Sequence, residues 1–433
     1  MKGTCIRLCM ALAVVLLLSA LSGCGKKPDQ NEQAGPVEIT VVTPFSESDG
    51  NRTNFVAAYQ DYEVASGNTV VDIMTFGINE DWKANVISNF LNGKDPDVIF
   101  YFTGADADEL IQNNKLVSIS DIRKEYPDYA SNMKESLMPV STYDGRQYAV
   151  SVYGYWEGLF VNKKVLEDCG IALPGAGYTW EQFLADCRII RSKGYTPIAC
   201  ALADVPHYWF EYCVFNNGSV ASHTKLPTGD DTGDDIRANL EAGLADIKEL
   251  YAEGFFPENT AGATDDETVM LMAENKAAFL LDGSWKVGWF EEHVPDINDF
   301  VVTYVPAKGV RKSTDAIGGF SMGYSISKKA WDDPQKREAC VQFITAMTTD
   351  EVVSTFGALT VTSLKNGVIA SGELDELSLS ALAMTKGCTA MVPAVQDLLN
   401  PMAREALFMD IIHIAAGDIT PEQAVDACLA LMQ

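Results

Sequence analysis

The chain has few of the residues that metal, redox and phosphate chemistry requires. Its 433 residues include four scattered histidines and no HExxH motif, Walker A loop or zinc-type cysteine spacing. None of the ten cysteines stands in a CxxC pair. We therefore expect no cofactor, no metal ion and no catalytic residues.

Positive charge is also scarce. The chain has 32 lysine and arginine residues against 60 aspartate and glutamate residues, which gives a formal net charge of −28. A protein this acidic is repelled by nucleic acids and by anionic lipids. Neither is an expected partner, and we interpret the acidity as a contribution to solubility.

A long apolar run is absent as well. Leu8 to Leu18 is apolar over eleven residues, whereas a membrane-spanning helix needs roughly 20. The run follows Lys2 and Arg7 and precedes small residues, which is the order of a secretory signal peptide. We therefore expect the protein to be exported.

The segment Leu21-Ser22-Gly23-Cys24 follows this run and resembles the lipobox of bacterial lipoproteins. The resemblance implies that residues 1–23 are a signal peptide and that Cys24 is acylated and becomes the N-terminus. The alternative is an ordinary signal peptide with a chance cysteine. Residues 24–36 contain no large apolar side chain after Cys24, so they are expected to form a lipidated, flexible tether. The protein would then sit on the extracytoplasmic face of the bacterial cell membrane.

The number and spacing of the remaining cysteines do not indicate a disulfide framework. Seven remain once Cys5 and Cys9 leave with the signal peptide and Cys24 is lipidated. Because seven is odd and the spacings are irregular, we expect mostly small buried apolar side chains. Whether any two of them pair stays open.

Strand and helix patterns alternate over the first part of the body. Strands are predicted at 37–42, 69–75 and 97–102, and helices around 55–62 and at 80–91. The continuous apolar run at 97–102 is typical of a buried parallel strand. Together these elements predict an open α/β sheet.

Open α/β sheets bind ligands at the carboxyl ends of their strands. Here those ends are the loops at 45–52 and 103–108, which are rich in short polar side chains. Glu47, Thr103 and Asp106 are the candidate ligand contacts in these loops.

Further along the chain, several segments occur in a characteristic order. They are GLFVNKKVLEDCGI at 158–171, TWEQF at 179–183, GYTPIA at 194–199, NKAAFLLDGSW at 275–285, YVPAKG at 304–309 and GDITPEQAVDAC at 417–428. In this order they are similar to the extracellular solute-binding proteins of ABC sugar importers, the family that contains maltose-binding protein. The series covers nearly all of 37–433. One departure is Val161, where the family usually has a structural tyrosine.

The resemblance implies an α/β, two-lobed, periplasmic-binding-protein-like fold. Each lobe would be a mostly parallel sheet flanked by helices, and crossing strands would form the hinge. By position, the first lobe takes 37–152 plus 303–355, and the second takes 153–302 plus 356–433. The implied function is a monomeric, lipid-anchored subunit that captures a carbohydrate, expected to be an oligosaccharide, and delivers it to the transmembrane subunits of an ABC permease.

Sugar recognition needs aromatic faces for the C–H surface of the ring and planar polar groups for its hydroxyls. Aromatic clusters and strand ends supply such residues, and the family's glycine-rich loop approaches the sugar. The candidates added on this basis are Tyr153, Trp156, Trp209, Asp282, Trp285, Gly319 and Phe320. Trp180 follows Thr179, the first residue of a predicted capping box with Gln182, and is expected to pack under that helix.

Two other motifs point to different chemistry. Residues 319–323 fit the G-x-S-x-G nucleophile elbow, which requires a helix directly after the serine. Here 324–327 alternates as a strand, so we interpret the motif as a loop. The acidic run at 229–235 has an incomplete EF-hand spacing, which favours a solvated loop over a calcium site.

Three functions stay open from the sequence. The first is capture of a carbohydrate for an ABC transporter. The second is the same fold binding a non-sugar solute or acting as a sensor subunit. The third is a surface glycoside hydrolase, although no carboxylate pair is selected by spacing.

Overall fold

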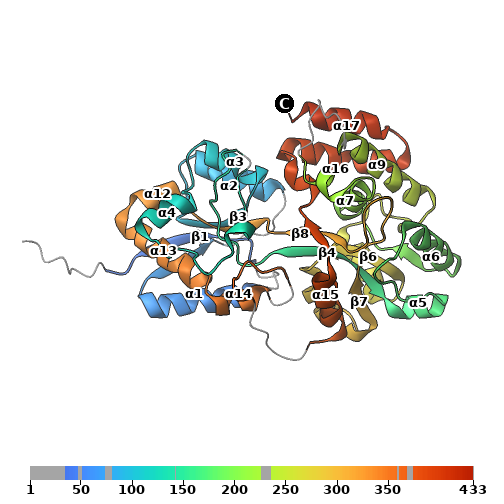
Figure 1. Cartoon of the computed structure of the whole chain (residues 1–433), viewed down its shortest axis with the longest axis horizontal. Helices are drawn as coiled ribbons and strands as arrows, with labels where there is room; N and C mark the ends of the chain where they lie inside the picture. The colour runs from blue at the N-terminus through green and yellow to red at the C-terminus, as the bar shows by residue number, and fades with distance from the viewer. Residues whose placement is uncertain are drawn as a thin grey trace, which may run out of the picture. The chain divides into compact units, whose positions relative to one another are not determined.

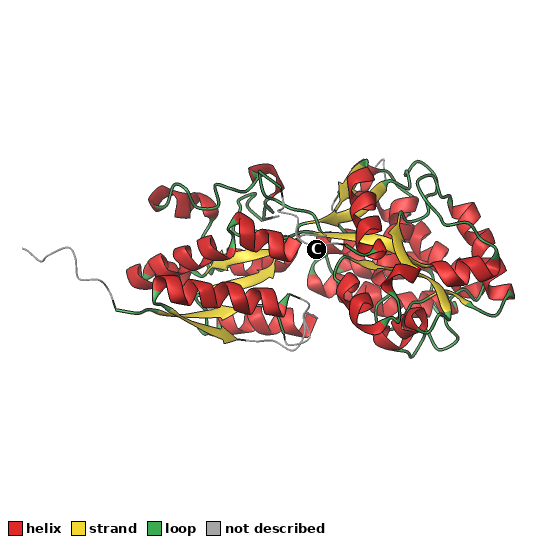
Figure 2. Cartoon of the chain, turned by 90° about the horizontal axis from the view of Figure 1, so that it is seen from below, coloured by secondary structure: helices red, strands yellow, loops and turns green. Residues whose placement is uncertain are grey.

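The structure is a computed structural model that describes residues 35–46, 51–73, 80–141, 143–225, 236–357, 360–367 and 374–432. From Val37 onward the chain forms one compact unit with two sheets, each flanked by helices (Figures 1 and 2). The expected signal peptide and Cys24 lie outside the described residues. Within those residues, none of the helices has the length and apolar character needed to cross a membrane.

A four-stranded sheet forms the first lobe, in the order β2-β1-β3-β9. Its strands are β1 (Glu38–Val42), β2 (Thr69–Ile73), β3 (Val98–Phe102) and β9 (Met322–Ile326). Strand β1 is parallel to β2 and β3, whereas β9 is antiparallel to β3. Strand β3 is buried almost throughout, as its apolar run predicts.

Helices cover both faces of this sheet (Figure 1). Alternating residues of β3 divide between two cores, with Phe100 facing Phe55 and Phe343 on one side, and Ile99 facing Phe90 and Leu110 on the other. The helical elements of this lobe are α1 (Arg52–Ser66), α2 (Glu80–Leu91), α3 (Ala105–Gln112), α4 (Ile119–Glu125), η1 (Glu135–Leu137), α12 (Lys328–Asp332), α13 (Pro334–Met347) and α14 (Asp350–Gly357).

A six-stranded sheet forms the second lobe, in the order β10-β8-β4-β6-β5, with β7 also on β4. Its strands are β4 (Tyr155–Asn162), β5 (Thr196–Ile198), β6 (Ala277–Gly283), β7 (Phe300–Thr303), β8 (Asp315–Gly319) and β10 (Ala390–Val392). Strand β4 is antiparallel to β6, β7 and β8, and the other pairings are parallel. The expected α/β sheets flanked by helices are confirmed. The first sheet is mostly parallel, as expected, whereas three of the five pairings in the second are antiparallel because its central strand β4 is reversed. The reversed strands, β4 and β9, are those that follow a crossing between lobes.

The second lobe carries most of the helices. They are α5 (Lys163–Cys169), α6 (Trp180–Ser192), α7 (His207–Asn216), α8 (Val220–His223), α9 (Ile236–Ala252), α10 (Asp265–Ala273), α11 (Lys286–His293), η2 (Ile297–Asp299), α15 (Glu376–Gly387), η3 (Val395–Leu398), α16 (Pro401–Ala416) and α17 (Pro421–Ala430). The predicted capping box of α6 is confirmed. The Gln182 amide donates to Thr179 Oγ1 at 3.2 Å, and Gln182 Oε1 accepts from the Thr179 amide at 3.0 Å.

The chain passes between the lobes three times, and two of these crossings differ from the expected boundaries. The first lies at Tyr153–Gly154, as expected, because Val150 pairs with β9 and Tyr155 with β8. The second lies between Gly319 and Met322 rather than near Thr303, since β7 and β8 both pair with β4. Position along the chain did not reveal this pairing.

The third crossing also comes later than expected. Residues 360–367 still belong to the first lobe, where the Lys134 amide donates to the Ser363 carbonyl at 2.7 Å. Helix α15 then packs on β7 of the second lobe. The crossing therefore begins after residue 367 rather than at 355, and part of it, 368–373, lies outside the described residues.

The seven cysteines that follow Cys24 are all unpaired, and all except Cys388 are buried. Burial raises the pKa of the Cys200 thiol and of the Cys340 thiol. A raised pKa keeps a thiol protonated and unreactive. The expectation that these cysteines act as small apolar core residues is confirmed.

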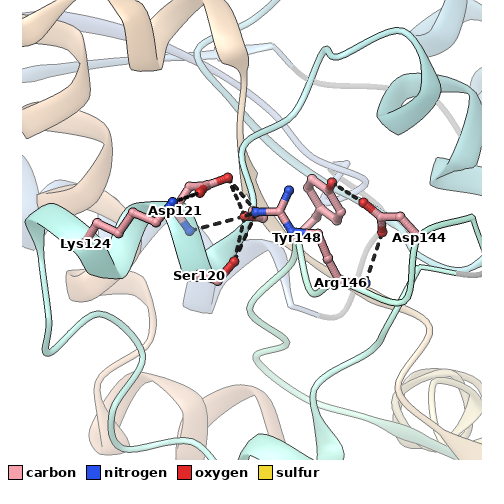
Figure 3. Close-up of polar contacts among 7 residues, drawn as sticks. Ser120, Asp121, Lys124, Asp144, Arg146 and Tyr148 are labelled. Atoms are coloured by element: carbon pink, nitrogen blue, oxygen red, sulfur yellow. Dashed lines mark hydrogen bonds and ion pairs between the residues drawn. The ribbon is translucent and has the colours of Figure 1, made fainter.

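A polar network ties helix α4 to the loop before the first crossing (Figure 3). Arg146 donates to Asp121 at 2.5 Å and to Ser120 at 3.1 Å, and Tyr148 donates to Asp144 at 2.7 Å. Lys124, one turn along α4, also donates to Asp121, at 2.7 Å. Hydrogen bonds from Lys124 and Arg146 lower the pKa of Asp121 well below its ordinary value.

This network predicts how stability depends on pH. A carboxyl whose pKa is lower in the folded than in the unfolded state stabilises the fold above its unfolded value of about 4. That contribution is lost as the pH falls through the folded value. We expect Asp121→Asn to lower the free energy of unfolding at pH 7 and to lower it less at pH 3, in urea titrations. Asp61→Asn, on the exposed side of α1, is the control. If the loss of unfolding free energy in Asp121→Asn were as large at pH 3 as at pH 7, the lowered pKa of Asp121 would not be its cause.

Trp180 is a core residue, as expected from its place after the cap. It is buried against Phe183, with ring centroids 5.4 Å apart. We expect Trp180→Ala to lower the free energy of unfolding by about 3–5 kcal/mol, since the truncation leaves a cavity. The matched control is Val64→Ala, at a side chain that is 87% exposed, where stability should hardly change. Equal, small effects in both variants would show that α6 is not held by this contact.

Candidate functional site

Trp285 lies where strand β6 ends and helix α11 begins. Its side chain is 51% exposed, although the strand before it is fully buried. A Cβ atom at Gly283 would lie 2.2 Å from the Trp285 ring, so only glycine lets the ring fold back over the strand end. The sequence prediction of a turn that presents this tryptophan is consistent with this geometry.

Two tyrosines flank this ring. The Trp285 ring centroid lies 6.2 Å from that of Tyr155 on β4 and 5.8 Å from that of Tyr208 on α7, with interplanar angles of 37° and 41°. We call Tyr155, Tyr208 and Trp285 the aromatic triad. Its members come from three separate segments, and it presents aromatic surface of the kind that stacks on flat apolar faces.

Trp156 and Trp209 were expected as ligand contacts and instead lie in the core. Trp156 is buried beside Phe160 at 6.0 Å, and Trp209 is stacked on Phe183 at 5.3 Å. Successive residues of a strand or helix point to different sides, so the neighbours Tyr155 and Tyr208 reach the triad in their place. The alternation in β4 was the signal that could have identified Tyr155.

Asp282 lies at the end of β6, as expected, but its oxygens already have partners. It accepts from the Gly283 amide at 2.7 Å, and a carboxylate oxygen lies 3.3 Å from Lys286 Nζ. Lys286 also donates to Asp265 at 2.8 Å. Burial raises the pKa of Asp282 to about 6 against the opposing charge of Lys286. Asp282 therefore contributes charge to the site, but both of its carboxylate oxygens already have partners.

Two buried glutamates behind the triad escaped the sequence analysis. Glu157 on β4 and Glu211 on α7 are 1% and 0% exposed, and neither oxygen of Glu211 has a hydrogen-bond partner among the described residues. Burial, and then the charges of neighbouring carboxylates, raises the pKa of each well above its ordinary value. One proton shared between the two is the simplest arrangement, because two adjacent buried carboxylates repel each other.

A third carboxyl adjoins this pair. Tyr155 Oη donates to Asp397, on η3, at 3.3 Å and accepts from the Ala394 amide at 3.2 Å. Burial and the charge of Asp106 raise the pKa of Asp397 to about 6, although Lys83 and Arg404 oppose this. Asp397 is half-buried and so lies nearer to solvent than the glutamates.

Asp106, expected as a ligand contact, instead forms ion pairs that link the two lobes. Its two carboxylate oxygens lie 2.8 Å from Arg404 of α16 and 3.0 Å from Lys83 of α2, and all three side chains are largely buried. Arg404 belongs to the second lobe, and the other two belong to the first. The same junction includes His207, whose pKa is lowered to about 3 by burial and by these cations.

The other expected residues follow the crossings. Thr103 donates through its amide to the Ser321 carbonyl at 2.8 Å, and Tyr153 is stacked between Phe100 and Phe356. Gly319 has a φ of +149°, which favours glycine, and Phe320 follows it. All four are half-buried, so the structure places them at the hinge. Glu47 lies outside the described residues.

The nucleophile-elbow motif finds no structural support as a site. Ser321 lies in the link between β8 and β9, and the next helix, α12, begins at Lys328, which is not a nucleophile elbow. The acidic run at 229–235 falls outside the described residues. Within the described part of the chain, no three His, Cys, Asp or Glu side chains converge as metal ligands.

One cavity lies away from the triad. It has a volume of about 490 Å³ and is lined by segments of 177–181 and 307–314. Arg311 in its wall already donates to the Asn216 side chain at 2.7 Å and to the Val305, Pro306 and Asp315 carbonyls at 2.9, 2.6 and 2.7 Å. Its guanidinium is thus held by the fold.

Two α/β lobes joined by three crossings, with an exposed aromatic ring beside the junction, define a hinged ligand-binding protein. The model of the bacterial extracellular solute-binding proteins matches residues 56–353. The chain belongs to that family, whose members are binding proteins rather than enzymes. No curated protein sequence matches the chain.

Solved structures agree with this fold. A chitin oligosaccharide binding protein is 21% identical, with a TM-score of 0.79 over 92% of this chain and 98% of that one. A substrate-binding protein from Listeria monocytogenes in complex with cycloalternan is 17% identical, with a TM-score of 0.72 over 92% and 98%. A solute-binding protein in complex with raffinose is 19% identical, with a TM-score of 0.70 over the same shares.

The Asp106–Arg404 pair predicts a preference for the state in which the lobes touch. A contact made only in one state biases the population towards it. We expect Arg404→Met to increase the ligand-free radius of gyration in small-angle scattering, while Asp106 keeps Lys83 as its partner. Arg188→Met, which removes a surface pair with Glu253, is the control and should leave the radius unchanged. An unchanged radius in both variants would show that the pair does not hold the lobes together.

Proposed function

We propose that this protein captures a carbohydrate between its lobes and delivers it to an ABC permease. The observation that carries the proposal is the aromatic triad, with a half-exposed tryptophan over buried carboxyl groups. Flat aromatic faces bind the C–H surface of a sugar ring, and carboxylates accept from its hydroxyls. The oligosaccharides in the names of the solved relatives support the same ligand class.

The crossings supply a hinge for this capture. The links at 153–154 and 319–322 are two of the three crossings between the sheets, so rotation there would open or close the site. A ligand that contacts Trp285 on one lobe and Thr103 or Phe320 near the other would favour the closed state. Tyr153 and Gly319, at the crossings themselves, would position the ligand through the hinge.

The remaining parts of the proposal concern location and partners. A signal peptide at 1–23, a lipid on Cys24 and a tether to residue 36 would hold a monomeric body at the extracytoplasmic face of the membrane. Permease transmembrane subunits would receive the sugar there. Radiolabelled fatty acid should enter the wild-type chain and not Cys24→Ala.

The buried carboxyl pair argues against the hydrolase alternative. Retaining and inverting glycosidases separate their two carboxyls by roughly 5–10 Å, so that a sugar bond and a water fit between them. Glu157 and Glu211 are 1% and 0% exposed, so no sugar bond and water fit between their carboxyl groups. Thermal melting against a panel of mono- and oligosaccharides and of non-sugar solutes distinguishes carbohydrate capture from the other alternative, binding of a non-sugar solute. A ligand at 100-fold excess over its Kd stabilises by about 2.7 kcal/mol.

Trp285→Ala tests the site directly. The half-exposed ring contributes little to the stability of the ligand-free protein, so we expect the variant to melt at nearly the same temperature as the wild type without ligand. Sugar binding should weaken by at least tenfold in calorimetry, because the stacking surface is lost.

The matched control is Trp180→Ala, which should melt early and, where folded, bind normally. A Trp285→Ala protein that melted much earlier yet bound the same sugar as the wild type would place the site elsewhere. Reducing ends released from the bound sugar by the purified protein would refute a pure binding role.

A further inference from the structure

Glu157 and Glu211 lack the donors that buried carboxyl groups require. Within the described residues, neither oxygen of Glu211 and not Oε2 of Glu157 accepts a hydrogen bond from an amide, hydroxyl or basic side chain. The two carboxyl groups influence each other electrostatically, which satisfies neither of them. Unsatisfied buried polar atoms in a native fold call for an additional partner.

The charged groups around the pair are mostly acidic. Asp397 on η3 and Asp282 on β6 face it with carboxylates, and Arg404 on α16 is the cation that acts on Glu211. Arg404 is already 2.8 Å from Asp106, and Lys286 is held by Asp265 and Asp282. The site therefore carries more negative than positive charge, and a bound cation would offset the excess.

The aromatic triad adjoins this charge. Glu157 follows Tyr155 by two residues on β4, and Glu211 follows Tyr208 by three on α7, so each lies on the same face as a tyrosine of the triad. Aromatic faces attract cations, and carboxylates both attract them and accept their hydrogen bonds. Because no three His, Cys, Asp or Glu side chains are placed to ligate a metal in the described chain, an organic cation fits better than a metal ion.

We propose that the site takes an amino sugar, a carbohydrate with a protonated amino group, whose ammonium is held by Asp397, Glu157 and Glu211 beside the aromatic triad. The inference rests on the proposed function and specifies its ligand class. The ammonium supplies three N–H donors and one positive charge to carboxyls that lack both. Hydroxyl groups of a neutral sugar would supply the donors without the charge. Asp397, which is half-buried, meets the ligand first, and the glutamates lie deeper.

Two oligomers of equal length that differ only in the amino group test the proposal. Glucosamine oligomers carry ammonium groups at pH 6, and N-acetylglucosamine oligomers carry neutral amides on the same backbone. We expect calorimetry at low ionic strength to show at least tenfold tighter binding of the glucosamine form. Added salt should reduce that difference, because it screens the charge.

Isosteric variants assign the preference to residues. Glu157→Gln combined with Glu211→Gln keeps the shape of the pair and removes its charge, so the fold should melt no earlier than the wild type. Binding of the glucosamine form should fall at least tenfold while other sugars bind as before. Glu253→Gln, which removes a surface carboxylate paired with Arg188, is the control and should change neither.

The outcomes separate this inference from the proposed function. Equal binding of both forms, or tighter binding of the acetylated form, overturns the amino-sugar inference and leaves carbohydrate capture in place. If neither glucosamine nor N-acetylglucosamine oligomers bind but another sugar of the panel does, the amino-sugar inference is likewise overturned and carbohydrate capture is retained. A preference for the glucosamine form that survives in the double variant overturns the role of the glutamates. If no sugar binds at all, both proposals are lost.

Discussion

Strand β4 carries the second lobe and the candidate site together. Its eight residues are buried throughout, and its two edges pair with β6 on one side and with β8 and then β7 on the other. The strand begins directly after the first crossing, so the hinge and the sheet share one continuous segment. Tyr155 and Glu157, the first and third residues of β4, lie on the same face of the strand, where the aromatic triad and the carboxyl pair are found. A shift in the register of β4 would move both off the site.

Charge is distributed unequally around this strand. At the lobe junction, Asp106 has two cations within 3.0 Å and both of its oxygens are paired. Behind the triad, both oxygens of Glu211 and Oε2 of Glu157 have no hydrogen-bond partner among the described residues. Buried charge that is fully paired holds a structure together, whereas buried charge without a partner is costly and is characteristic of functional sites. The same fold thus pairs one carboxylate across its lobes and leaves others without a hydrogen-bond partner.

Local patterns predicted much of this architecture. The bounds of α2, the capping box of α6, the core position of Trp180 and the buried cysteines follow from the residues themselves. The exposed ring of Trp285 could also be anticipated, because a short Asp-Gly-Ser turn ends a buried strand just before it. These features depend on neighbours within one or two turns of the chain.

Other features depend on residues that are distant in sequence. The choice between Tyr155 and Trp156, or between Tyr208 and Trp209, depends on which face of β4 or α7 meets which core. The later crossings depend on β7 and β8 pairing with β4. Glu157 and Glu211 are buried behind the triad because α7 docks on that strand, where Tyr212 donates to the Glu157 carbonyl at 3.0 Å. By itself, the sequence determined the elements, the family and the tryptophan at the strand end, because short-range periodicity and turn chemistry control them. Only the tertiary structure decided where the lobes divide and which carboxyls meet, because burial and pairing are set by long-range packing.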